Sequence, residues 1–173
     1  MTNFLNKFPW LSAKLSSQNN FVHEGDIEKL ETAVCLESVL EICYQSFAQL
    51  IHNRIIREES QKFRLISQKH QRELRQWLPF SLEVESRIEK RIQEYLVNLD
   101  PVRLSLSGVV NLSISLAAHK MDIYKYMQRT HSKHHYFFFN RLIEDSLEEM
   151  HFLRMEKEFH QKSPAQIQIK IAS

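Results

Sequence analysis

Residues 26–56 read DIEKLETAVCLESVLEICYQSFAQLIHNRII and contain neither glycine nor proline. The whole chain of 173 residues has two glycines and four prolines, and none of them lies between Gly25 and Pro79. Apolar residues recur at helical spacing along this stretch, and Asp26 stands where a side chain that caps a helix N-terminus is expected. We therefore expect a long helix over about 27–56.

The apolar pattern is interrupted by the charged stretch at 57–61 and resumes over about 62–78. Pro79 then removes a backbone donor and ends the second run. A helical hairpin with its bend at 57–61 explains the interruption. One continuous helix is the alternative.

The second half of the chain repeats this layout. Asp100-Pro101 has the form of an N-cap followed by proline at the first helical position, which predicts a helix over about 101–128. A polar stretch follows, and the apolar spacing then predicts a last helix over about 135–160, closed by Pro164. These two helices would form a second hairpin.

Between the two halves, apolar residues at helical spacing predict a further helix over 82–98. The expected fold class is therefore all-α: a four-helix bundle of two antiparallel hairpins with an extra crossover helix. We expect one domain over 26–163, because a chain of this length buries a single core. Residues 1–25 and 164–173 are expected to be an N-terminal arm and a C-terminal tail.

Composition and charge exclude several classes of partner. The 23 basic residues are interleaved with 21 acidic ones, so no electrostatic footprint for nucleic acid stands out. No apolar run reaches transmembrane length, since the best candidate, 104–118, is short and rich in serine. Cys35 and Cys43 would lie about 12 Å apart on one helix at ~1.5 Å per residue, too far for a disulfide. These features favour a cytoplasmic protein.

Charged residues lie at the centre of the apolar stripes expected on three helices. Glu37 is central on the first helix, with Glu41 near the edge of its stripe. His70 is central on the second helix, with Glu73 on its flank. Lys120 is near-central on the helix predicted over 101–128. A buried carboxylate needs a nearby cation, so we expect Glu37 to pair with Lys120 and His70 to hydrogen-bond Glu73 or Glu41, unless His70 binds a metal.

The last predicted helix carries Glu148-x-x-His151, and with it the layout over 27–160 resembles the ferritin-like superfamily, rubrerythrins in particular. In that family, a glutamate from each of two helices and a Glu-x-x-His from each of the other two hold two iron or manganese ions. Glu37 resembles the first-helix glutamate, whereas His70 and Glu73 stand in the reverse order of the motif. The ligands implied by the resemblance are Glu37, Glu41, His70, Glu73, His119, Glu148 and His151.

Because Lys120 or His119 stands where the family has a glutamate, the leading interpretation is a bundle with a degenerate di-metal site and no cofactor. Such a protein would be a binding, structural or regulatory module. The alternative is a rubrerythrin-like di-iron or di-manganese oxidoreductase with an atypical ligand set, so the chain's status as an enzyme stays open. A helical partner protein unrelated to metal sites, or a homo-oligomer joined through apolar faces, explains the same stripes. In either non-metal case Glu148 and His151 belong to an exposed face.

A histidine cluster, His131, His134 and His135, lies in the polar stretch before the last helix. Its spacing matches no closed metal site, so a solvated turn is favoured over an opportunistic transition-metal site.

Overall fold

The computed structural model describes residues 24–98, 105–131 and 133–167. These residues form five α-helices and no strand, which confirms the all-α class for this part of the chain: α2 (Glu24–Leu50), α3 (Arg54–Arg75), α4 (Leu82–Asn98), α5 (Leu106–Thr130) and α6 (Lys133–Ile167). No helix in this part of the chain combines the length and the hydrophobicity needed to cross a membrane.

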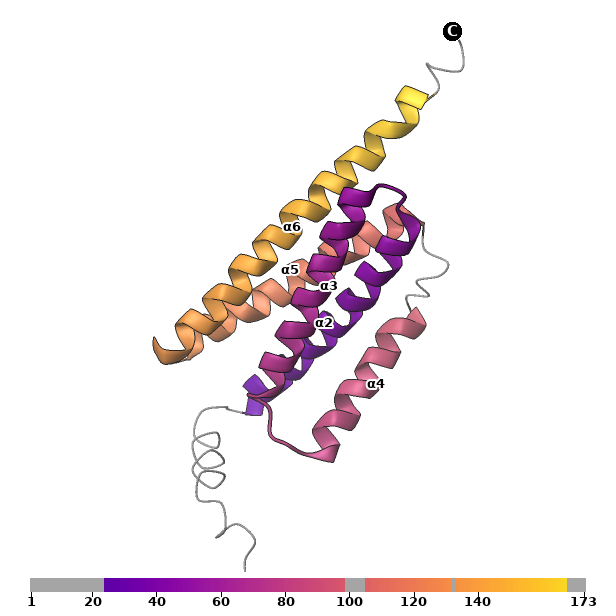
Figure 1. Ribbon diagram of the computed structural model, residues 1–173. Coiled ribbons are helices and arrows are strands. Elements are labelled where there is room, and N and C mark those ends of the chain that lie inside the picture. Colours follow the sequence, from indigo (N-terminus) through magenta and orange to yellow (C-terminus); the bar gives the residue numbers. More distant parts are fainter. Residues whose placement is uncertain (1–23, 99–104, 132, 168–173) are drawn as a thin grey trace, which may run out of the picture.

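The helices are arranged around α2 (Figure 1). The pair α2 and α3 and the pair α5 and α6 each form an antiparallel hairpin, and α4 lies along α2 on the side away from α6. Because α3, α4 and α5 all pack against α2, every residue from 33 to 40 is buried. A helix covered on several sides is apolar nearly all round, and this is why the first part of the quoted stretch is so rich in apolar residues.

The first hairpin is confirmed, and the single long helix is wrong. The bend lies earlier than the predicted 57–61, because α2 ends at Leu50 and Asn53 caps α3: its side-chain oxygen accepts the backbone N–H of Ile55 at 2.9 Å. The charged stretch instead begins α3, where Glu58 pairs with Arg54 on the exposed face.

The predicted start of α2 also needs correction. The helix includes Glu24, so Asp26 lies within the first turn of α2 rather than capping it. The side chain of Asp26 is buried and faces His131, which lies in the turn between α5 and α6.

In the second half, α4 has the predicted bounds, Leu82–Asn98. The next helix begins later than predicted, at Leu106, because Ser105 is its N-cap and accepts the backbone N–H of Gly108 at 3.2 Å. Asp100 and Pro101 lie outside the described residues. The last helix continues to Ile167, so Pro164 does not close it and the predicted end near 160 is wrong. Most of the expected arm and tail, residues 1–23 and 168–173, is likewise not among the described residues.

Two aromatic clusters fill the core at different heights along the bundle. Phe63 of α3 packs on Phe152 of α6, with ring centroids 5.1 Å apart. Trp77, which lies in the turn just after α3 and seven residues after His70, stacks on Phe138 with centroids 5.1 Å apart. His70 is seven residues from both Phe63 and Trp77, about 10 Å along the axis from each, so apolar rings flank it on both sides.

Candidate functional site: a charged layer in the bundle core

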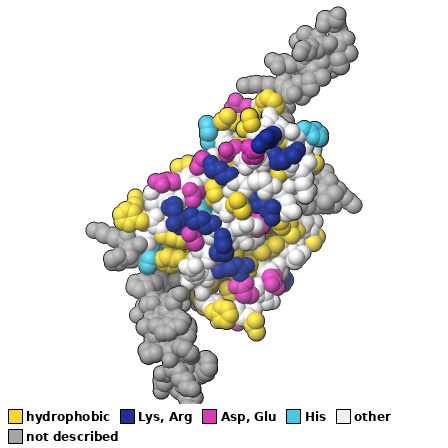
Figure 2. Space-filling model, in the orientation of Figure 1, with side chains coloured by type: hydrophobic (Ala, Val, Ile, Leu, Met, Phe, Trp, Pro, Cys, Tyr) yellow, Lys and Arg dark blue, Asp and Glu magenta, His cyan; other side chains and the backbone are white. Residues whose placement is uncertain are grey.

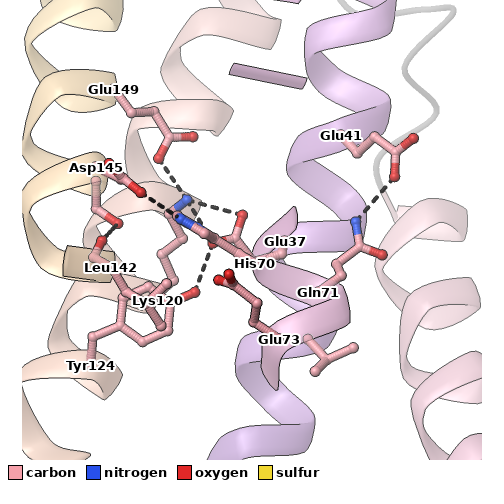
Figure 3. Close-up of polar contacts among 12 residues, drawn as sticks. Glu37, Glu41, His70, Gln71, Glu73, Lys120, Tyr124, Leu142, Asp145 and Glu149 are labelled. Atoms are coloured by element: carbon pink, nitrogen blue, oxygen red, sulfur yellow. Dashed lines mark hydrogen bonds and ion pairs between the residues drawn. The ribbon is translucent and has the colours of Figure 1, made fainter. Parts of the chain in front are cut away.

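Polar side chains from four helices meet in the middle of this core (Figure 3). They are Glu37 and Tyr44 of α2, His70 of α3, Lys120 and Tyr124 of α5, and Asp145 and Glu149 of α6. We call this set the charged layer. Apart from Asp145, each member exposes 3% of its surface or less. On each helix that supplies two members they are four or seven residues apart, so they share one face.

Lys120 is the cation that holds the layer together. Its Nζ lies 2.6 Å from Oε2 of Glu149 and 3.0 and 3.1 Å from the two carboxylate oxygens of Glu37. The contact expected between Glu37 and Lys120 is therefore present. Burial alone lowers the pKa of Lys120, but the two carboxylates, Glu149 first, outweigh burial and raise that pKa above 10.5. Lys120 is charged at every physiological pH.

Glu37 is the ionised carboxylate of the pair. Burial opposes its charge, but the nearby Lys120, the His70 ring and the Tyr124 hydroxyl together lower its pKa from 4.5 to about 2. The same oxygen, Oε1, accepts from Tyr124 at 2.7 Å and faces Nδ1 of His70 at 2.8 Å. Two helices thus supply hydrogen-bond donors to one carboxylate, with Lys120 as a third donor, an arrangement that strongly favours its charged form.

Glu149 is the weaker acid of the pair. Burial raises its pKa above 4.5, and the negative charge of Glu37 adds to this, while Lys120 and Tyr44 act in the opposite direction. The Tyr44 hydroxyl lies 2.5 Å from Oε1 of Glu149 and donates to it. One ammonium group therefore lies between two carboxylates, and Glu37 also accepts from Tyr124 and faces His70, whereas Glu149 accepts from Tyr44.

His70 bridges two carboxylates with its two ring nitrogens. Nδ1 lies 2.8 Å from Glu37 and Nε2 lies 2.9 Å from Oδ2 of Asp145. A neutral imidazole carries one N–H, so only the imidazolium can donate to both carboxylates. Burial lowers the pKa of His70, but the bonds to Asp145 and Glu37 outweigh burial and raise that pKa above 6.5. The bond to His70 in turn lowers the pKa of Asp145.

Asp145 connects the charged layer to solvent. Its side chain is 27% exposed, whereas His70 is fully enclosed. The hydrogen-bonded chain from Glu37 through His70 therefore reaches the surface at Asp145. Burial raises the pKa values of Tyr44 and Tyr124 well above 10, so both hydroxyls stay protonated and act as hydrogen-bond donors.

Two of the predicted core residues lie outside the charged layer. Glu41 accepts from Gln68 at 2.5 Å and from Gln71 at 3.0 Å, and Figure 3 shows it apart from the cluster. Glu73 pairs with Arg141 at 2.7 Å. Neither reaches His70, whose expected hydrogen bond to Glu73 or Glu41 is therefore wrong.

The remaining candidate ligands, His119, Glu148 and His151, are exposed. Glu148 lies 2.6 Å from Lys62 of α3 in a surface ion pair. The motif that carried the family resemblance therefore does not face the charged layer. Within the described ranges, no three His, Cys, Asp or Glu side chains are grouped as they would be around a metal ion.

The candidate residues named from the sequence did not include Glu149 or Asp145 of the last helix. The face of this helix that packs inward follows Leu142, Ser146, Glu149 and Leu153, whereas Leu147 is 53% exposed. Their spacing of four, three and four residues is a regular helical stripe, which was the available signal. Because Ser146 and Glu149 are polar, this stripe is difficult to recognise as a buried face from the sequence.

The two cysteines are not suited to nucleophilic chemistry. Cys35 and Cys43 are buried free thiols, and burial raises the pKa of each to about 11, so neither is a nucleophile at neutral pH. On the face shown in Figure 2, side chains of both charges are interleaved with apolar ones.

No family model, no curated protein and no solved structure matches this chain. The fold and the charged layer therefore define its class: an all-helical bundle with a lysine-centred ionic core.

Proposed function

We propose that this chain is a ferritin-like bundle in which a lysine has replaced the metal ions, and that it serves as a binding, structural or regulatory module rather than as an oxidoreductase. The observation that carries the proposal is the position of Lys120, fully buried between the carboxylates of Glu37 and Glu149. In ferritin-like bundles, carboxylates from facing helices hold the metal ions at this kind of position.

The chemical argument is one of charge. The ammonium group of Lys120 already engages both carboxylates at 2.6–3.1 Å, and His70 supplies a second positive charge through Nδ1 at 2.8 Å from Glu37. A divalent ion at the same point would meet two cations in a medium that screens them poorly. The first-row metals that such sites hold need free carboxylate and neutral imidazole ligands. Here Lys120 pairs with the carboxylates, and the ring of His70 carries a proton on each nitrogen.

The topology supports the same proposal. Two antiparallel hairpins joined by a long crossover are the connectivity of ferritin-like folds, and here the crossover contains α4. The charged layer draws one or two residues from each of the four bundle helices, as the metal sites of that superfamily do. The layer departs from the family pattern at Lys120 and in the exposure of Glu148 and His151.

The experiment is to restore the missing ligand. A Lys120→Glu variant places a third buried carboxylate beside Glu37, Glu149 and His70, while Lys120→Met removes the charge without adding a ligand. We expect Lys120→Glu to bind Mn²⁺ or Fe²⁺ and to gain thermal stability from the ion. We expect Lys120→Met and the wild type to gain no metal at this position.

Two results would overturn the proposal. If the wild type, purified without chelators, holds about two iron or manganese ions per chain and a Glu37→Ala variant loses them, the protein is the rubrerythrin-like oxidoreductase. If Lys120→Glu folds, as circular dichroism reports, yet binds neither ion above the wild-type level, the layer is an ionic core with no metal-site ancestry.

A further inference from the structure

At one end of the bundle, the start of α2 lies against the turn between α5 and α6. Here Nε2 of His131 faces Oδ2 of Asp26 at 3.8 Å. The two side chains are only 4% and 5% exposed. This pair is separate from the charged layer and belongs to the histidine cluster whose role the sequence left open. The prediction that this cluster is a solvated turn is wrong for His131.

The hydrogen bonds of the ring fix its tautomer. Nδ1 of His131 lies 3.1 Å from the backbone oxygen of Met127 and 3.1 Å from the Thr130 hydroxyl, which donates its own proton to the backbone oxygen of Tyr126 at 3.0 Å. A carbonyl only accepts, so Nδ1 carries the proton and Nε2 of the neutral ring presents a lone pair. That Nε2 atom is buried and has no hydrogen-bond partner. An imidazole whose far nitrogen donates to a backbone carbonyl is oriented as metal-binding histidines usually are.

Two acceptors therefore face each other, which is unfavourable unless a cation lies between them. A direct imidazolium–carboxylate bond would bring the two atoms to about 2.7–2.9 Å, well inside the observed separation. A tetrahedral ion bound at ~2.0–2.1 Å to each atom holds them about 3.4 Å apart, within a small side-chain rotation of the observed 3.8 Å.

The surroundings hold the His131 ring in place. It packs against Phe139, with centroids 6.0 Å apart, and against His135, with centroids 6.1 Å apart. His135 itself meets the Trp77 ring edge-on at 4.4 Å. The ring cannot turn away from Asp26 without disturbing this aromatic end of the core.

We propose that a divalent transition-metal ion binds between Asp26 and His131, with water in its remaining positions. An imidazole nitrogen and a carboxylate are ligands that Zn²⁺ accepts. The described residues supply two ligands and no third His, Cys, Asp or Glu, so the bound ion exchanges readily. It ties the first turn of α2 to the α5–α6 turn and stabilises the end of the bundle. The inference does not rest on the proposed function, because Lys120 and its partners take no part.

The test uses Zn²⁺ as the probe, titrated calorimetrically into the full chain after chelator treatment. We expect one ion per chain and a rise in the thermal unfolding midpoint that EDTA reverses. The near-isosteric variants Asp26→Asn and His131→Gln should each lose more than about tenfold in Zn²⁺ affinity. A matched His119→Gln variant, which removes an exposed histidine of α5, should bind as the wild type does.

A second measurement needs no variant to fold. In long-range ¹H–¹⁵N spectra of the wild-type histidine rings, Zn²⁺ should shift the Nε2 resonance of His131 and leave its Nδ1 protonated. The proposal fails if the wild type does not bind Zn²⁺, if both variants bind it unchanged, or if the His131 resonances do not respond.

Discussion

Replacing Lys120 by methionine should destabilise the fold severely, because it removes the ammonium group that lies between two buried carboxylates. Glu37 would keep its bonds to His70 and Tyr124, but Glu149 would keep only the Tyr44 hydroxyl. Methionine has nearly the same length and fills the same space, so the loss is one of charge rather than of packing.

The size of the loss follows from the burial of the ions. Breaking a buried ion pair by removing one partner costs about 3–5 kcal/mol, since the remaining charge is uncompensated. An exposed pair is worth about 0–1 kcal/mol, so Lys90→Met, which removes the surface partner of Glu94, is the matched control. Adding Glu149→Gln to Lys120→Met should recover part of the loss, because it removes the stranded carboxylate.

The assay is urea unfolding followed by circular dichroism at pH 7. With a denaturant slope of about 2 kcal/mol per molar urea, the expected loss lowers the unfolding midpoint by roughly 2 M. The deficit of the Lys120→Met variant should shrink as the pH is lowered towards 5, because protons then neutralise the carboxylates. A deficit below about 1 kcal/mol, or one that is equal at both pH values, would refute this account of the core.

Three further predictions concern the layer and the faces of α6. Folding raises the pKa of His70, so the contribution of His70 to stability is present below pH 6.5 and is lost as the pH rises through the folded-state pKa. The difference in unfolding free energy between wild type and His70→Gln, measured by urea unfolding from about pH 5 to 9, should therefore shrink as the pH rises. A difference that grows would contradict the bridging role of His70. Tyr44→Phe should cost about 1.5–3 kcal/mol by the same assay, because a buried charged acceptor on Glu149 loses its donor, and a neutral result would count against the bond. Leu142→Ala should cost about 2–5 kcal/mol and Leu147→Ala less than about 0.5 kcal/mol, whereas the opposite ranking would contradict the burial of Leu142 and the exposure of Leu147.

The parts of the fold that the sequence predicts well are those with a strong local signal. The crossover helix has the predicted bounds because a loop that contains Pro79 separates it from the preceding helix. Glu37, His70 and Lys120 could be placed in the core because each interrupts an otherwise apolar stripe within a regular helix. The contact between Glu37 and Lys120 follows from the high cost of leaving a buried charge alone, whereas the partners of His70 were not predicted.

The parts that failed depend on tertiary packing. The bend after α2 is set by Asn53, a short polar residue beside an apolar run, and the charged stretch after it proved to be helical. The Glu-x-x-His pattern has helical spacing, but spacing does not say which side of a helix faces the core; Glu148 and His151 lie on an exposed face, as the interpretations without a metal site expected. The pair of Asp26 and His131 joins residues from opposite halves of the chain, so no local pattern reveals it.

The most direct test of the central claim is the pKa of Lys120 itself, measured by NMR from the pH dependence of its side-chain ¹³Cε and ¹⁵Nζ shifts in the folded protein. Burial without compensating carboxylates lowers the pKa of a lysine, whereas the ion pairs with Glu149 and Glu37 raise it. We predict that the pKa of the Lys120 ammonium group in the folded protein is above 10.5. A pKa well below 10.5 would contradict the claim that Lys120 is the cation of the core.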